Sequence, residues 1–172
     1  MTNSPRATRA EISDVFNAVL DGTDATMLSG ESANGLYPRE SVETMASVDR
    51  TAQDELLEFG RFSLNGFVTD THAKQIALSA REAAQYGDIK VIVVYTESGE
   101  SAQTLAQYRP DADILAVTFD SKTQKSLMAT YGVESIVDRK PTDADDMFSR
   151  AEELAQRYGS AKVGDDIIIV AG

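Results

Sequence analysis

Apolar residues follow two kinds of pattern in the second half of the chain, and each pattern predicts one kind of element. Short continuous apolar runs such as "IKVIVVYT" predict strands that are buried on both faces. These strands are expected over residues 89–96, 113–119, 134–138 and 165–172. Apolar positions three or four residues apart predict helices over residues 71–86, 101–108, 121–131 and 143–158. This alternation is typical of a three-layer α/β/α domain with a mostly parallel sheet.

The first sixty residues follow a different order of patterns. A helix is expected over residues 9–20, where the Asp21-Gly22 pair ends the apolar periodicity. The short apolar segment "TDATML", residues 23–28, predicts a buried strand, and a second helix is expected to begin at Pro38. Glycines and scattered aromatic residues in "GRFSLNGFVTD" then interrupt the pattern. We therefore expect two domains, residues 1–60 and 61–172.

Composition narrows the possible partners of this 172-residue chain. The net charge is −12, and so acidic a surface repels phosphate backbones, which argues against nucleic-acid binding. The chain has no cysteine, so disulfides, thiolate metal sites and a cysteine nucleophile are excluded. No apolar run reaches the length of a membrane span, and "MTNSPRATRAE" has no apolar signal core. A cytoplasmic protein without a membrane partner is expected.

Three stretches of the sequence carry a resemblance to the pyruvate kinase family. "PRATRAEISDVFNAVLDGTDATMLSGESANGLYPRESVETM" resembles the last part of its (β/α)8 catalytic barrel, with Ala7 where the family usually has proline. "IVVYTESGESAQTLAQYRPDADILAVT" and "GDDIIIVAG" resemble its C-terminal domain. The resemblance covers essentially the whole chain. It implies that residues 1–60 are a fragment of a barrel, and that residues 61–172 are a regulatory and assembly domain lacking its final strand.

The resemblance also implies an activity for the parent protein. Pyruvate kinases transfer a phosphoryl group between phosphoenolpyruvate and ADP, giving pyruvate and ATP in the last step of glycolysis. They use Mg²⁺ and K⁺ and assemble as tetramers. The metal-ligating carboxylates, the catalytic lysine and the K⁺ site belong to earlier barrel strands, so this chain is expected to bind neither metal and to be inactive alone. The alternative is a stand-alone, non-catalytic regulatory module that binds a phosphate ligand.

Three residues of the barrel segment are expected at the periphery of the parent's active site. The resemblance places Thr8 at the mouth of the site, and Ser29 and Glu31 on its nucleotide side. Each has a structural alternative. Thr8 precedes Glu11 by three residues, which predicts a helix capping box. For Ser29 and Glu31, the alternative is that "SGES" is simply a turn between the expected strand and the following helix, made possible by its glycine.

The loop "TESGES" is the candidate phosphate-binding site of the second domain. Backbone N–H groups at a helix N-terminus suit an anion, and hydroxyl groups add hydrogen-bond donors. The resemblance implies that this loop holds a phosphate of a sugar-phosphate or nucleotide effector. The residues expected to bind it are Thr96, Ser98, Gly99 and Ser101. Two carboxylates in the same loop, Glu97 and Glu100, oppose such binding, and a helix cap with a glycine turn is the alternative interpretation.

Other polar residues are interpreted as structural. The single histidine, His72, is expected to be a solvated helix residue, and the acidic cluster at residues 143–146 marks a helix start. Because "TDATML" lacks the neighbouring strands of a barrel, its backbone groups need other partners. We therefore expect residues 1–60 to be partly disordered, swapped between chains, or packed as helices against the second domain.

Overall fold

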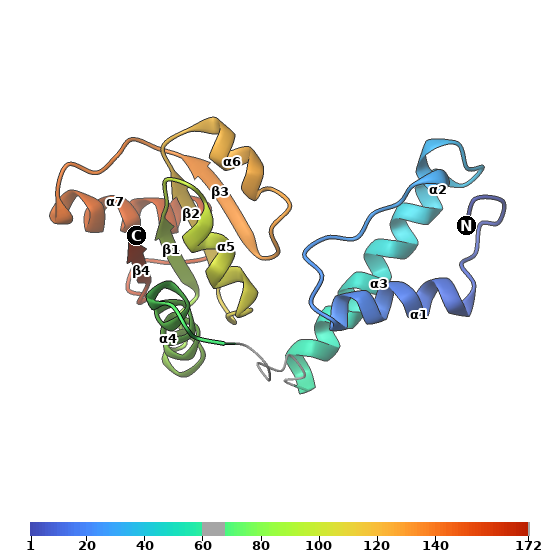
Figure 1. The fold of residues 1–172 in the computed structure, drawn as a ribbon, viewed down its shortest axis with the longest axis horizontal. Helices are drawn as coiled ribbons and strands as arrows, with labels where there is room; N and C mark the ends of the chain where they lie inside the picture. Colours follow the sequence, from blue (N-terminus) through green and yellow to red (C-terminus); the bar gives the residue numbers. More distant parts are fainter. Residues whose placement is uncertain (60–67, 172) are drawn as a thin grey trace. The chain divides into compact units, whose positions relative to one another are not determined.

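The computed structural model describes residues 1–59 and 68–171, which belong to two compact units (Figure 1). The first unit comprises Met1–Asn65 and the second Gly66–Gly172. The expected domain boundary at residue 60 lies among residues 60–67, outside the described residues. Each unit is therefore described by itself.

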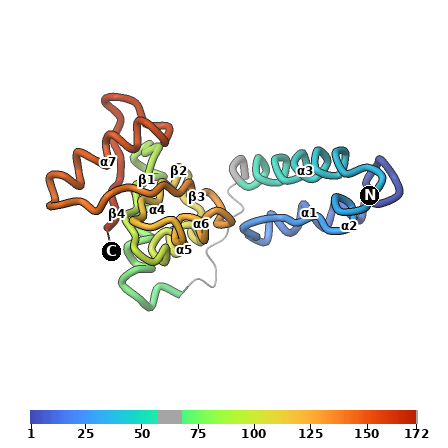
Figure 2. The backbone as a smooth tube through the Cα atoms, turned by 90° about the horizontal axis from the view of Figure 1, so that it is seen from above, coloured from blue at the N-terminus to red at the C-terminus, as the bar shows by residue number. Residues whose placement is uncertain are grey.

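The first unit is helical. Its elements are α1 (Arg9–Leu20), α2 (Gly30–Ala33) and α3 (Pro38–Phe59). Helices α1 and α3 pack against each other, and Figure 2 shows them running alongside one another. Proline at the first position of α3 loses no hydrogen bond there, because the first N–H groups of a helix have no partner within it. Val19 and Ala52 are buried in this small unit.

The expected strand at residues 23–28 is wrong. This segment forms no strand, although its Thr26 hydroxyl donates a 2.8 Å hydrogen bond to Asp49 of α3. A strand requires a neighbour that supplies the other half of its hydrogen-bond ladder. The first unit contains no strand among its described residues, so this apolar segment has no strand to pair with.

The second unit is built on a parallel sheet of four strands among its described residues. The strands are β1 (Val91–Tyr95), β2 (Asp113–Thr118), β3 (Val133–Val137) and β4 (Ile168–Ala171), in the spatial order β3-β2-β1-β4. The helices are α4 (His72–Gly87), α5 (Glu100–Gln107), α6 (Ser121–Leu127) and α7 (Ala144–Tyr158). This alternation confirms the α/β class and the parallel sheet expected from the sequence.

Helices cover both faces of the sheet. Val93 of β1 and Leu115 of β2 pack in one buried cluster with Leu154 of α7. Because side chains alternate along a strand, Ile92 and Val94 point to the opposite face, and both are fully buried. Helix α5 contacts β1, β2 and β3, and α4 packs on α5. The expected three layers are therefore present.

The ends of some elements differ from the sequence prediction. Helix α6 ends at Leu127, short of the glycine that seemed to end it, because the N–H of Thr130 turns back to the carbonyl of Leu127. Strand β4 begins at Ile168 and not at residue 165. The one-turn helix α2 was not expected at all.

Candidate functional site

Three helices begin at the carboxyl edge of the sheet. Helix α5 follows β1, α6 follows β2 and α7 follows β3, each after a short loop. This is the edge at which parallel α/β sheets bind ligands, because the loops and the positive ends of the helices converge there. The candidate phosphate-binding loop lies at this edge, between β1 and α5.

Helices α6 and α7 are capped by aspartates. Asp120 accepts hydrogen bonds from the backbone N–H groups of Lys122 at 2.7 Å and Thr123 at 3.1 Å. Hydrogen bonds from the Thr123 hydroxyl and from these two N–H groups hold the pKa of Asp120 below its usual value. Asp143 caps α7 in the same way, accepting from the N–H of Asp146 at 2.8 Å. The positive ends of these two helices are thus already neutralised.

Helix α5 has no such cap. Its N-cap residue is Gly99, which has no side chain to cap the helix, and the neighbouring Ser98 hydroxyl accepts only a long 3.3 Å hydrogen bond from the N–H of Glu100. Glu100, in the first turn, supplies negative charge to this end but does not replace the cap. The start of α5 is therefore more open to an outside anion than the starts of α6 and α7.

Hydrogen bonds within the loop fix its turn. The Thr96 hydroxyl, which is buried, accepts from the N–H of Gly99 at 2.9 Å. Gly99 has φ +90°, a left-handed conformation that favours glycine. The Ser98 hydroxyl accepts a 3.3 Å hydrogen bond from the N–H of Glu100. The structure thus brings Thr96, Ser98 and Gly99 into one turn, with half-buried Ser101 in the first turn of α5.

A lysine from a distant loop lies over this turn. The Lys140 ammonium, from the loop between β3 and α7, is 2.5 Å from the Glu97 carboxylate and 5.7 Å from the ring centre of Phe119. Its hydrogen bond holds the pKa of Glu97 below the usual value. The Thr123 hydroxyl, which donates to Asp120 at 2.7 Å, also lies 3.0 Å from the Glu97 carbonyl as an alternative acceptor. Sequence reasoning missed Lys140, because only the parallel order of the strands brings the two loops together.

One further polar group lies buried at this edge. The hydroxyl of Thr118, at the end of β2, is fully buried and has no hydrogen-bond partner among the described residues. Tyr95 pairs with Val117 in the register of β1 and β2. The next pair along is Thr96 and Thr118, so their side chains lie on the same face of the sheet.

Two bidentate arginine–aspartate pairs hold the β3–α7 loop. Arg150 of α7 binds Asp138 with contacts of 2.6 and 2.8 Å, and its hydrogen bond lowers the pKa of Asp138. Arg139 binds Asp146 with contacts of 2.5 and 2.6 Å. The acidic cluster at residues 143–146 therefore begins and anchors α7, as predicted. His72 is the exposed first residue of α4, also as predicted.

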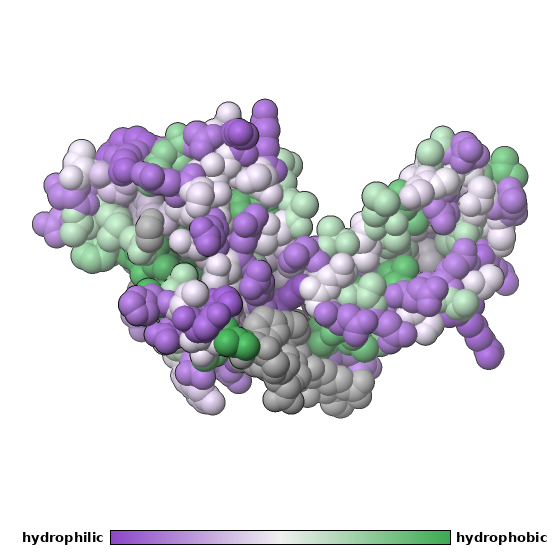
Figure 3. Space-filling view, in the orientation of Figure 1, coloured by the Kyte–Doolittle hydropathy of each residue, from purple (hydrophilic) through white to green (hydrophobic). Residues whose placement is uncertain are grey.

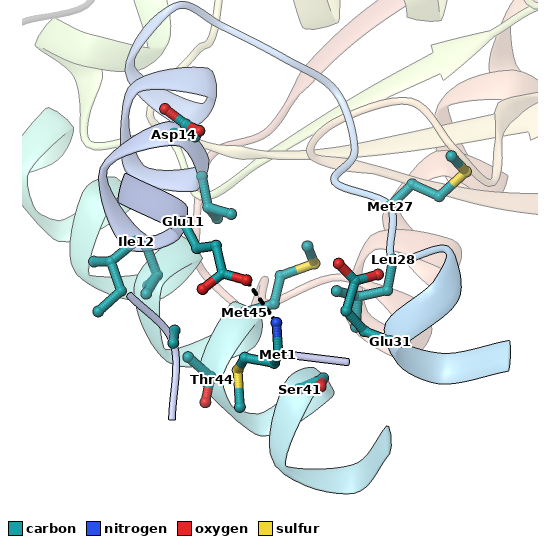
Figure 4. Close-up of a pocket in the computed structure, with 13 residues that line it drawn as sticks. Met1, Glu11, Ile12, Asp14, Met27, Leu28, Glu31, Ser41, Thr44 and Met45 are labelled. Carbon is teal, nitrogen blue, oxygen red and sulfur yellow. Dashed lines mark hydrogen bonds and ion pairs between the residues drawn. The ribbon is translucent and has the colours of Figure 1, made fainter. Parts of the chain in front are cut away.

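The barrel segment places Thr8 in the predicted capping box. The Thr8 hydroxyl accepts from the N–H of Glu11 at 3.3 Å, and the Thr8 N–H donates to the Glu11 carboxylate at 2.7 Å. The Glu11 carboxylate also binds the ammonium of Met1, as Figure 4 shows. This ammonium, together with Thr8, lowers the pKa of Glu11 to about 2.

Glu31 faces a pocket, whereas Thr8 and Ser29 are not among the residues that line it. The pocket has a volume of about 220 Å³, and the carboxylates of Glu11 and Glu31 point into it (Figure 4). Its floor is apolar and includes Leu28 and Met45. The N–H of Ser29 donates to the Glu31 carboxylate at 3.1 Å, and backbone hydrogen bonds lower the pKa of that carboxylate.

The first unit leaves apolar side chains at its surface. Met27 is 81% exposed and Leu36 is 72% exposed. Figure 3 shows green hydrophobic patches among the purple hydrophilic side chains of this unit. Large contiguous apolar patches mark interaction surfaces, whereas single exposed apolar side chains are common in folded proteins.

The described residues provide neither a metal cluster nor a membrane span. Within residues 1–59 and 68–171, no three histidine, aspartate or glutamate side chains come together in a way that suits a metal ion. These residues therefore do not fit a carboxylate site for the Mg²⁺ that the family resemblance implies. No helix in the described part of the chain is long and apolar enough to cross a membrane.

Comparison with known proteins gives consistent matches over the whole chain. Residues 74–172 match the family model "Pyruvate kinase, alpha/beta domain", and residues 1–42 match "Pyruvate kinase, barrel domain". The pyruvate kinase of Lactococcus lactis subsp. lactis is 55% identical over all 172 residues, which correspond to 34% of that protein. The pyruvate kinase of Lactobacillus delbrueckii subsp. bulgaricus is 46% identical, with all of this chain matching 30% of its length.

A solved structure gives the same result for the fold. A crystal structure of a pyruvate kinase from Cryptosporidium parvum superposes with a TM-score of 0.84 and 34% sequence identity. The match covers 99% of this chain and 35% of that one. The chain thus spans about a third of the length of the relatives that it matches.

Proposed function

The chain belongs to the pyruvate kinase family, and from this membership we infer that it is the carboxyl-terminal third of a pyruvate kinase. The complete protein would transfer a phosphoryl group between phosphoenolpyruvate and ADP, giving pyruvate and ATP. It would be a cytoplasmic homo-oligomer that uses Mg²⁺ and K⁺. Thr8, Ser29 and Glu31 are assigned to the periphery of its active site, with Glu31 facing the pocket beside α1.

We assign regulation and assembly to this part of the enzyme. The observation that carries the regulatory role is the start of α5, which no aspartate caps, beside the turn of Thr96, Ser98 and Gly99. Backbone N–H groups at such a start bind phosphate, and the hydroxyls of Ser98 and Ser101 add donors. A sugar phosphate or a nucleotide would bind there through its phosphate group.

A thermal-shift titration tests the effector site. We expect fructose 1,6-bisphosphate, AMP or another ligand from a panel of phosphate esters to raise the melting temperature saturably. The variant Gly99→Val should abolish the shift, because valine is strained at φ +90° and an added Cβ lies 3.2 Å from Leu127 Cδ2. Gly164→Val is the matched control, since Gly164 also has a positive φ and no atoms lie near its added Cβ. No saturable response to the whole panel would refute effector binding.

An activity assay tests whether this chain catalyses the reaction on its own. We expect the isolated chain to form pyruvate from phosphoenolpyruvate and ADP no faster than the buffer alone. The reason is that it lacks a cluster for Mg²⁺ in its described residues and the earlier barrel strands that the family uses for catalysis. Turnover near that of a full-length relative would contradict this assignment.

The second candidate is a stand-alone regulatory module that binds a phosphate ligand without catalysing a reaction. The phosphate site at the start of α5 supports this candidate equally, because no residue of the barrel segment belongs to the site. Sequencing the gene on both sides of the segment separates the two. A reading frame that continues upstream through a full barrel supports the kinase, and start and stop codons around these residues support the module.

A further inference from the structure

The ion pair between Glu97 and Lys140 is the one contact between charged side chains that joins two loops at the carboxyl edge of the sheet, among the described residues. Both side chains are mostly exposed, at 67% and 69%. Exposed pairs of this kind contribute little to folding, since water solvates both partners almost as well. The pair is thus easily opened by a competing anion.

The negative charges around the start of α5 make a cation necessary for phosphate binding, in addition to the backbone N–H groups. Glu97, Glu100 and Asp120 place three carboxylates around this edge, and they would repel a phosphate dianion. Lys140 is the ammonium that the structure places directly on the β1–α5 loop. The Lys140 ammonium has three N–H donors, and the Glu97 carboxylate accepts from one of them.

We propose that Lys140 is the cation that binds the ligand phosphate at the start of α5, and that the Glu97 carboxylate competes with the phosphate for it. This inference rests on the phosphate-binding function proposed above. The buried Thr96 hydroxyl fixes the turn through the N–H of Gly99, so the backbone stays in place while the exposed Glu97 side chain rotates away. The Lys140 ammonium is then free to pair with a phosphate monoester beside the N–H groups of α5.

The buried hydroxyl of Thr118 is an independent sign that this edge has unused hydrogen-bonding capacity. Buried polar groups are almost always paired in folded proteins, and those that are not are often found where a water molecule or ligand binds. Thr118 is fully buried, has no partner among the described residues, and stands next to Thr96 in the strand register. The Thr118 hydroxyl thus leaves one buried hydrogen-bonding group unsatisfied at this edge, among the described residues.

A double-mutant cycle on the full chain tests the proposal. The probes are inorganic phosphate and glucose 6-phosphate, and their dissociation constants are read from the amide resonance of Gly99. We expect Glu97→Gln to tighten binding about fivefold, which corresponds to removing one negative charge about 4 Å away in water. Lys140→Met should weaken binding by about the same factor or more. In the Lys140→Met background, Glu97→Gln should retain only a small part of its effect.

Lys122→Met is the matched control, because it removes a charge from the neighbouring α6 start without touching the pair. If Lys140→Met weakens binding no more than Lys122→Met does, this inference is wrong while the phosphate site stands. If neither the unmodified chain nor Glu97→Gln binds either probe saturably, the phosphate site and this inference both fail. If Glu97→Gln tightens phosphate binding as much in the Lys140→Met background as in the unmodified chain, Glu97 acts only by repelling the phosphate. That result would also overturn this inference.

Discussion

Thr96→Val isolates the hydrogen bond on which the β1–α5 turn depends. Thr96 is only 2% exposed, and its hydroxyl accepts a 2.9 Å hydrogen bond from the N–H of Gly99. Valine has almost the same shape, so the variant removes the hydroxyl without opening a cavity. The backbone hydrogen bond from the Thr96 N–H to the Val117 carbonyl, at 3.0 Å, remains in place.

The magnitude follows from what the Gly99 N–H loses. A buried donor left without a partner costs about 1–3 kcal/mol, more than the net value of the hydrogen bond itself. We therefore expect Thr96→Val to lower the free energy of unfolding of the second unit by about 1–3 kcal/mol. Ser98→Ala is the control, because its hydrogen bond is exposed and long, at 3.3 Å, and should cost less than about 0.5 kcal/mol.

Amide hydrogen exchange of the full chain is the assay, because it reports each unit separately. The exchange of slowly exchanging amides in β1 and β2 gives the free energy of unfolding of the second unit. The Gly99 amide should also lose most of its protection in Thr96→Val and keep it in Ser98→Ala. An effect of Thr96→Val on β1 and β2 that is no larger than that of Ser98→Ala would refute the reasoning.

Three further predictions follow from contacts in the second unit. Gly159→Ala should destabilise it by about 1–3 kcal/mol in urea denaturation, because the added Cβ would lie 2.8 Å from the buried Val91 side chain; a loss below about 0.5 kcal/mol, as for an ordinary surface substitution, would contradict this. The hydrogen bond from Arg150 lowers the pKa of Asp138 in the folded protein below its ordinary value of 3.8. The stabilisation that this ion pair gives the second unit is therefore complete above about pH 4, and it is lost as the pH falls through the pKa of the folded state. The stability difference between the unmodified chain and Asp138→Asn should accordingly shrink between pH 5 and pH 2, and a constant difference would count against the ion pair. Asp120→Ala should speed amide exchange at the start of α6 and leave α7 unchanged, and equal protection in both proteins would argue against the cap.

The sequence was informative where local pattern and tertiary context agree. The apolar run at β1 implied burial on both faces, and all five of its residues are buried. The aspartates at residues 143–146 implied a helix start, and Asp143 caps α7. At Thr8 the capping box could be read directly from the spacing to Glu11.

The failures have physical causes. The segment at residues 23–28 has strand-like composition, yet a strand forms only when another strand pairs with it. Helix α2 is a single turn, too short to produce a periodic pattern. The contact between Lys140 and Glu97 depends on the order β3-β2-β1, which places loops 43 residues apart at one edge. No local property of either residue indicates it.

The position of β1 in the sheet determines when this unit can fold during synthesis. Strand β1 lies between β2, which follows it closely along the chain, and β4, which is the last of the four described strands to leave the ribosome. Its face with Val93 is covered by α7, which also emerges late. The nascent chain therefore carries an exposed apolar strand with one open edge until residue 171 has been translated and released from the exit tunnel. Chaperones that bind extended apolar segments would find their site at β1 for that whole interval.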